Sequence, residues 1–404
     1  MASSSACEHC APYKPRHFEN WLDDVLALLI HPFFGRITPA PVAARFTDTA
    51  ITNALVFFGI VRPERDFPLG KINPIAAIFI KRGQARGLAF EALRGPSGYL
   101  TFFRMCAGGR MRVIDRLPGA GANTFLADDK WRVKRELLKS GYPVAPGRAF
   151  WWFERRRAAR YAASLGFPVV VKPRRGSLSQ HMFVVKDGGR LAGAVRSVSS
   201  YAPAFLIEKF VPGATLYRAT VVDPPATATK ENGGGRGGGK RVFVVKRLPQ
   251  AVTGDGENTL LALARNAGFD LRRLDREFLK EQGAAADGII PRGKRVSLHR
   301  KAVMALHSEI VPVPPGEVHP SILAMCRSIA ERFALPLVGI DILMRDHRIP
   351  LGAQDAAVLE LNTLPNIVMH TFVKEGREEN EVADALVDLA AGAPAGPATS
   401  SISP

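Results

Sequence analysis

The chain has 404 residues, 47% of them hydrophobic, which is enough to build the cores of two or three domains. Lysine and arginine number 55 against 37 acidic residues, and this charge of +18 suits anionic ligands, although a generally basic surface would give the same excess. Four cysteines are too few for a disulfide scaffold and no signal peptide or membrane-spanning run is visible, so we expect a cytoplasmic protein.

Residues 1–125 are predicted to form an N-terminal domain of uncertain fold. The sequence CEHC at 7–10 could supply half of a zinc site, but no second pair of ligands with suitable spacing follows it. Residues 21–35 have the pattern of an amphipathic helix that ends at a proline and a glycine. The apolar run at 54–61 fits a buried strand or a helix equally well.

From residue 126 onward the pattern becomes regular. Helices, each ended by glycine and proline, are predicted at 128–140 and 154–165, and a further helix at 319–336. Runs rich in β-branched residues predict strands at 168–173, 183–187, 204–211, 216–223, 241–249, 337–345 and 356–362. This mixture indicates an α/β or α+β fold. Residues 393–404 are rich in small residues and proline, and we expect a disordered tail there.

The glycine-rich stretch at 233–241 imitates a phosphate-binding loop, because its glycines and Lys240 have the spacing G-x-x-x-x-G-K. A true loop of this kind opens into a helix and places serine or threonine after the lysine. Here Arg241 follows Lys240 and begins a predicted strand. Residues 223–240 are therefore interpreted as a flexible insertion in a hairpin.

Acidic and amide side chains project from apolar strands near the end of the chain. Positions i and i+2 of a strand face the same way, so Glu360 and Asn362 share one face. Asp341 lies in another apolar strand. Buried oxygens need a partner, and oxygen ligands suit Mg²⁺. The alternative is that Asp341 and Glu360 pair with basic residues.

Two lysines also occupy unusual positions. Lys172 ends a buried strand, where an ammonium group needs an anionic partner. Lys130 stands in the first turn of a predicted helix, where a cation opposes the helix dipole. Lys130 therefore has either a functional role or simple solvation beside the neighbouring carboxylates.

The order of these pieces resembles the ATP-grasp superfamily over about two-thirds of the chain. The segments that carry the resemblance are DDKWRVKRELLKSGYPVAPG, GFPVVVKPRRGS, FLIEKFVPG, KRLPQAVTGDGENT, LVGIDIL and VLELNTLPN. Among members of the superfamily, VTGDGENTLLALA is most similar to the ATP-grasp module of cyanophycin synthetases. The resemblance implies an α+β fold at 126–392, in which two α+β subdomains clamp ATP, one of them a lid at about 145–207.

The resemblance also implies a function: ATP- and Mg²⁺-dependent ligation of a carboxylate to an amine through an acylphosphate. The positions that match nucleotide-binding residues are Lys130, Lys172, Ser177, Glu208, Lys209, Phe210, Val211 and Arg218. The two lysines match phosphate ligands, and residues 208–211 match the hinge that receives adenine. The positions that match metal ligands are Asp341, Glu360 and Asn362, with Mn²⁺ as an alternative metal. Arg247 matches an arginine that stabilises the acylphosphate.

The chain departs from the family pattern at several points. The loop after the Lys172 strand has one glycine, Gly176, where two or three are common, and Gln180 and His181 stand where small residues are expected. An acidic residue for ribose is missing after the hinge, and the stretch at 298–311 replaces one rich in Asn, Ser, Thr and Gly. No Mur-ligase-like domain follows, so we do not expect this chain to make cyanophycin.

Three functions therefore stay open. The first is a ligase acting on small carboxylate and amine substrates, formed from amino acids or short peptides, with no membrane partner and with a homo-oligomer left open. The second is an ATP-binding protein of the same fold with weak or no turnover. The third is a nucleic-acid binder, which the +18 charge and the arginine run at 155–157 suggest but no motif supports.

Overall fold

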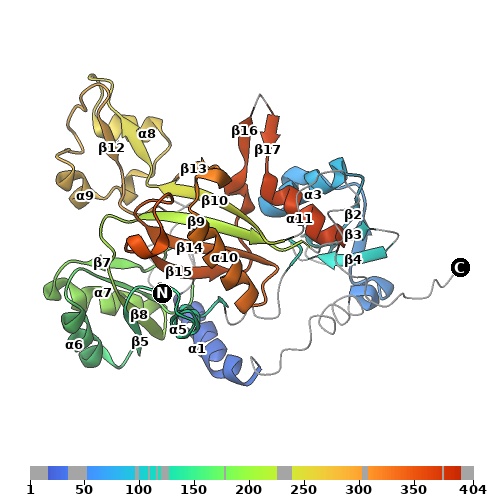
Figure 1. Cartoon of the computed structure of the whole chain (residues 1–404), viewed down its shortest axis with the longest axis horizontal. Helices are drawn as coiled ribbons and strands as arrows, with labels where there is room; N and C mark the ends of the chain where they lie inside the picture. The colour runs from blue at the N-terminus through green and yellow to red at the C-terminus, as the bar shows by residue number, and fades with distance from the viewer. Residues whose placement is uncertain are drawn as a thin grey trace, which may run out of the picture.

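In this computed structural model, the chain folds around three antiparallel sheets of four or five strands, and two further sheets have two strands each. Figure 1 shows their arrangement. The residues that the structure describes are 17–34, 52–95, 100–107, 110–114, 117–119, 127–176, 179–224, 239–302, 308–374 and 377–392. The CEHC motif, Ser177 and the expected tail at 393–404 lie outside these residues.

The central sheet has five strands in the order β13-β10-β9-β14-β15, all antiparallel. Its strands are β9 (Thr215–Val222), β10 (Arg241–Leu248), β13 (Glu309–Val313), β14 (Leu337–Met344) and β15 (Ala357–Asn362). Every second residue of β14, from Val338 to Met344, packs into a core beneath helix α10 (Pro320–Arg332). Helix α5 (Lys130–Lys139) contacts β15, and the 3-10 turns η6 (Pro315–Glu317) and η7 (Leu351–Ala353) lie in connecting loops. Part of the opposite face, at Val222, Leu337 and Phe243, packs into a second apolar core, and the charged side chains described below lie on the rest of that face.

The β5–β8 module forms the second sheet, with the strand order β5-β8-β6-β7. Its strands are β5 (Gly147–Trp151), β6 (Val169–Pro173), β7 (Phe183–Val185) and β8 (Ala204–Lys209). Helices α6 (Arg155–Leu165) and α7 (Gly188–Tyr201) share a separate apolar core with this sheet. The helix and the three strands that the sequence predicted in this segment are confirmed, whereas β5 and α7 were not predicted.

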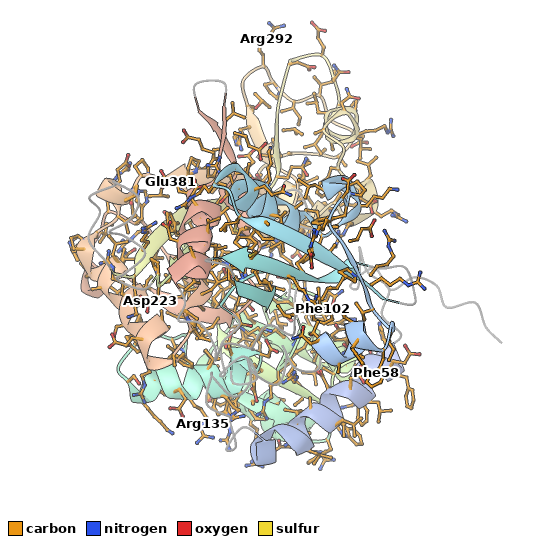
Figure 2. All side chains as sticks on the ribbon, turned by 90° about the vertical axis from the view of Figure 1, so that its right-hand side faces the viewer. Phe58, Phe102, Arg135, Asp223, Arg292 and Glu381 are labelled. Atoms are coloured by element: carbon orange, nitrogen blue, oxygen red, sulfur yellow. The ribbon has the colours of Figure 1, made fainter. Side chains whose placement is uncertain are left out.

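A third module, spanning 251–298, has an apolar core of its own that the sequence did not predict. Its elements are β11 (Ala251–Thr253), α8 (Leu260–Asn266), η4 (Leu271–Arg273), α9 (Arg276–Glu281) and β12 (Arg295–Ser297). It projects from the central sheet, and Arg292 lies near its outer tip (Figure 2). Gly254 allows a tight crossing there, because an added Cβ would lie 2.2 Å from the Pro291 carbonyl oxygen.

The N-terminal module pairs an antiparallel sheet with helices from both ends of the chain. Its elements are β1 (Arg62–Glu64), η2 (Leu69–Lys71), α3 (Pro74–Ala85), β2 (Ala89–Arg94), β3 (Leu100–Ala107) and β4 (Arg110–Ile114). The C-terminal elements are η8 (Ile367–His370), β16 (Phe372–Lys374), β17 (Arg377–Glu379) and α11 (Glu381–Gly392). Helix α11 packs on α3, and Asp388 bridges Arg86 and Arg241 at 2.7 Å and 2.6 Å.

Two further helical segments complete the described chain. Helix α1 (His17–Phe34) lies against α7, on the opposite side of the molecule from the third module (Figure 1). Residues 52–57 are helical, which decides between the two structures that the sequence left open for 54–61. Phe58 and Phe102, labelled in Figure 2, are exposed on the N-terminal module. Within the described ranges, no helix has the length and apolarity needed to span a bilayer.

Candidate active site

A row of charges crosses the face of the central sheet that is turned away from α10. Arg218 on β9 lies opposite Asp341 on β14, which in turn lies opposite Glu360 on β15. Glu360 and Asn362 share one face of β15, because they are two residues apart in the part of the strand that pairs with β14 in regular register; the bulge comes only after Asp341. Strand register thus brings together the residues that the sequence had placed on separate strands.

Asp341 is the centre of this row and is almost fully buried. The Arg218 guanidinium donates to both of its oxygens: Nε to Oδ1, and Nη2 to Oδ2 at 3.0 Å. Burial alone would raise the pKa of Asp341, but Arg218 and Arg247 hold it below its usual value. Gly339 makes room for this pair, because an added Cβ would lie 2.9 Å from the Arg218 guanidinium. The pairing of Asp341 with a basic residue, one alternative drawn from the sequence, is therefore present.

Arg247 reaches the same carboxylate from β10. Its Nη1 lies 3.7 Å from Oδ2 of Asp341, and the residue is only 6% exposed. Its buried Nε has no hydrogen-bond partner within the described part of the chain. A buried guanidinium N–H without an acceptor is costly, so this atom is suited to an anionic ligand.

The oxygen groups beside Asp341 suit a divalent cation. Asn362 Nδ2 lies 3.5 Å from Glu360 Oε1, and Lys130 Nζ lies 3.7 Å from Glu360 Oε2. Two carboxylates and one amide on a single face match the few protein oxygens that Mg²⁺ takes, with water and phosphate completing its shell. Across the described ranges, no three His, Cys, Asp or Glu side chains form a group that could hold a metal ion.

A second charged cluster surrounds Glu208 at the end of β8. Its carboxylate lies 2.6 Å from Lys172 Nζ and 2.8 Å from Lys134 Nζ, and all three side chains are buried. Burial alone would raise the pKa of Glu208, but the two lysines hold it below its usual value. Burial also lowers the pKa of Lys134 despite its carboxylate partner. Lys172 thus has the anionic partner that its position predicted.

The four predicted hinge residues divide into two groups. The side chain of Glu208 is held between lysines, and Lys209 Nζ donates to the carbonyl oxygens of residues 165 and 166 at 3.0 Å each. Both side chains are thus already engaged. Phe210 and Val211 follow the strand and are half-buried, and no hydrogen bond within the described chain occupies the backbone of Val211.

Helix α5 connects the two clusters. Lys130 and Lys134 lie on the same face of the helix, four residues apart, one directed to Glu360 and the other to Glu208. Asp129 caps the helix through the amides of residues 131 and 132 and pairs with Arg174 at 2.6 Å. The sequence missed Lys134, although its spacing from Lys130 was a usable signal.

Lys240, the lysine of the glycine-rich imitation, lies at the end of β10 that is remote from Arg247. Lys240 Nζ pairs with Asp223 Oδ2 at 3.3 Å, and β10 begins directly after it at Arg241. A strand rather than a helix follows the lysine, as predicted.

His370 is a buried residue near Arg218, and it was not identified from the sequence. Its Nε2 lies 2.9 Å from Thr220 Oγ1, and burial, with a smaller contribution from Arg218, lowers its pKa from 6.5 to about 3. The folded state then binds fewer protons than the unfolded state between these values. Stability should therefore fall as the pH drops below 6.5.

We expect the His370→Asn variant to lose part of the acid sensitivity of the wild type. His370 should contribute about 2 kcal/mol to the loss of unfolding free energy between pH 7.5 and pH 5. Urea unfolding of both proteins at the two pH values measures this difference, because the other titrating groups are shared. Equal losses in the two proteins would show that His370 is not buried in its neutral form.

The chain is similar to several known proteins. No family model matches the chain. Cyanophycin synthetase from Trichormus variabilis is 26% identical over 347 residues, covering 80% of this chain and 35% of that protein. The glutathione biosynthesis bifunctional protein GshAB of Streptococcus mutans is 24% identical over 321 residues, covering 72% and 39%. The expected resemblance to cyanophycin synthetases is confirmed.

The fold has a matching solved structure, a bifunctional glutathione synthetase from Pasteurella multocida. It aligns with a TM-score of 0.53 at 17% identity, covering 80% of this chain and 43% of that one. This likeness confirms the expected α+β fold. The chain spans about 35% of the length of the cyanophycin synthetase named above.

Proposed function

We propose that this chain, which has the ATP-grasp fold, is an ATP- and Mg²⁺-dependent ligase that joins a carboxylate to an amine. Its substrates would be amino acids or short peptides, and the bond formed would be a C–N bond of the peptide type. The observation that carries this proposal is the row of Arg218, Asp341 and Glu360. The row is flanked by Lys130 and by the Nε of Arg247, which has no hydrogen-bond partner among the described residues.

The proposed reaction has two steps. A substrate carboxylate oxygen attacks the γ-phosphorus of ATP, the bond to the β-phosphate oxygen breaks, and ADP leaves. The amine of the second substrate then attacks the acyl carbon, phosphate departs, and the amine loses a proton. Because the acylphosphate is labile in water, the site must close over it.

The charge of each site residue would determine its role in the reaction. Lys130 and Lys172 would bind phosphate oxygens, and Lys172 has donors left after its bond to Glu208. Arg247 would donate to the developing charge of the transferred phosphoryl group. Asp341, Glu360 and Asn362 would hold Mg²⁺, which offsets phosphate charge when bound. Arg218 would fix Asp341 in place.

Adenine would lie at the end of β8. We propose that it packs on Phe210 and bonds to the backbone of Val211, because the side chains of Glu208 and Lys209 are engaged elsewhere. Ser177, predicted beside the phosphates, lies outside the described residues.

The proposed division of the chain follows from this assignment. Residues 1–125 would form the N-terminal domain, and 126–392 the ATP-grasp domain, with the β5–β8 module as its lid. Residues 223–240 would be an insertion, because β9 and β10 pair on either side of it. The reaction would take place in the cytoplasm, where ATP is supplied.

Release of ADP from ATP in the presence of Mg²⁺ tests the proposal. We expect a pool of amino acids and short acidic peptides to stimulate ADP release, and the Glu360→Gln variant to show only background. Dividing the pool would then identify both substrates. Tight ATP binding with no stimulation by a complete pool of amino acids and dipeptides would favour the ATP-binding protein without turnover. Absence of ATP binding would overturn the proposal.

A further inference from the structure

Helix α1 precedes the proposed ATP-grasp domain by about a hundred residues, yet it packs against α7 of the β5–β8 module (Figure 1). Asn20 Nδ2 donates to the backbone carbonyl of Tyr201, at the end of α7, at 2.9 Å. The ring of His17 meets Tyr201 edge-on, with 5.7 Å between ring centroids. These contacts fix the first turn of α1 on the β5–β8 module.

The loop after β6 has an unusual backbone at the point where the family has glycines. Ser179 and His181 have φ values of 54° and 46°, which side-chain-bearing residues adopt at a cost of about 1 kcal/mol or more each. His181 is 1% exposed and stacks on Tyr201 with a centroid distance of 4.5 Å, while Gln180 accepts a hydrogen bond from Tyr201 at 2.8 Å. Side-chain packing therefore holds a backbone that glycine would adopt without strain.

The ring of His17 from α1 completes this packing. Its centroid lies 5.0 Å from that of His181, and the two rings meet edge to face. Gln180 and His181, the bulky residues that depart from the family pattern, thus contact α7, and His181 also contacts α1. Helix α1, which lies outside the proposed ATP-grasp domain, therefore helps to hold this part of the loop in place.

Two turns beyond His17 on α1, the Asp24 carboxylate reaches the same loop. Asp24 Oδ1 lies 3.4 Å from Arg175 Nε, and both side chains are about 15% exposed. Burial raises the pKa of Asp24 to about 6, and the charges of Arg175 and Lys130 partly oppose this shift. Lys130 Nζ in turn donates to the carbonyl oxygen of Gly176, the residue after Arg175. A chain of contacts therefore runs from α1 through the loop to Lys130.

We propose that Asp24 is a positioning residue for the nucleotide site: it holds Arg175 in place and thereby orients Lys130 for the phosphates of ATP. This inference rests on the proposed function, because it assigns a role in ATP binding. Loss of the contact should weaken ATP binding, since the loop and Lys130 would no longer be pre-arranged. Simple charge repulsion predicts the reverse, because removing a carboxylate near phosphates should tighten binding.

The test compares three variants by titration calorimetry with ATP and Mg²⁺. We expect Asp24→Asn to raise the Kd for ATP about tenfold, Asp24→Glu to recover part of the loss, and Asp23→Asn to match the wild type. Asp23 is the matched control, because it is the neighbouring carboxylate on α1 and is exposed. If the ligase reaction is observed, the KM for ATP should rise while kcat stays within about twofold.

Hydrogen exchange of the wild type provides a second readout, which does not depend on whether a variant folds correctly. We expect ATP with Mg²⁺ to slow amide exchange within residues 17–34. The inference would be overturned if folded Asp24→Asn bound ATP with an unchanged or lowered Kd. It would also be overturned if ATP left the amide exchange rate of α1 unchanged. Neither result would contradict the proposed function. A wild type that binds no ATP would overturn the proposed function itself, before any variant is compared.

Discussion

Replacing Arg247 by alanine should lower kcat of the proposed ligation by about 10²- to 10³-fold, the effect of removing one donor aimed at developing charge. Its buried Nε has no partner within the described residues, and its Nη1 makes only a 3.7 Å contact with Asp341. The side chain is thus held in the site with its Nε–H group available to donate a hydrogen bond to a ligand. Single-turnover measurement of ADP formation would isolate the phosphoryl-transfer step from product release.

The fold should tolerate this change, because Arg218 still pairs with both oxygens of Asp341. Lys246→Met is the matched control. Lys246 is the neighbour of Arg247 in the sequence, and its side chain points to the opposite face of β10, so the variant removes a cation that lies outside the site. We expect this control to retain wild-type kcat within about twofold. Comparable losses in both variants would mean that general positive charge, rather than the placed guanidinium, supports the reaction.

The central part of the candidate site follows from local patterns in the sequence. Alternation along the strand places Glu360 and Asn362 on one face, and the apolar neighbours of Asp341 predict a buried strand. The sequence left metal binding and ion pairing as alternatives for Asp341. The structure shows an ion pair with Arg218 beside Glu360 and Asn362, so the ion pair does not displace the oxygen cluster that Mg²⁺ would use.

What the sequence could not supply is the partner of each charged group. Arg218 and Asp341 are 123 residues apart, and their contact depends on the pairing and register of β9 with β14. The link from Asp24 to Arg175 joins the N-terminal helix to a loop of the β5–β8 module. Local periodicity carries no information on such pairs. The separate core of the third module was missed for the same reason, because its short elements bury their apolar faces only against one another.

Glu208 shows most clearly how a partner changes an assignment. By position alone it matched a residue that bonds to adenine, yet its carboxylate lies within 2.8 Å of both Lys134 and Lys172. A buried carboxylate between two buried ammonium groups neutralises charges that would otherwise be left without a counter-ion. Its first effect should therefore be on the stability of the β5–β8 module and on the position of Lys172.

Replacing Glu208 by glutamine is expected to destabilise the fold by about 3–5 kcal/mol, the usual cost of breaking a buried ion pair from one side. Both lysines would stay buried without a carboxylate, and the pKa of Lys134, already lowered by burial, should fall further. Urea unfolding at pH 7.5 measures the loss. Glu154→Gln is the matched control in the same module, because Glu154 pairs at 2.6 Å with the exposed side chain of Arg157 and should cost less than about 1 kcal/mol.

The pH dependence of this variant separates the ion-pair explanation from a simple packing defect. A lysine whose pKa is lower in the folded than in the unfolded state binds fewer protons when folded, so folding becomes more favourable as the pH rises toward the unfolded value. The deficit of Glu208→Gln should therefore shrink between pH 7 and pH 9.5. A packing defect would leave the same deficit at every pH. Adding Lys134→Met to Glu208→Gln should recover part of the lost stability at pH 7, because it removes one of the two uncompensated charges.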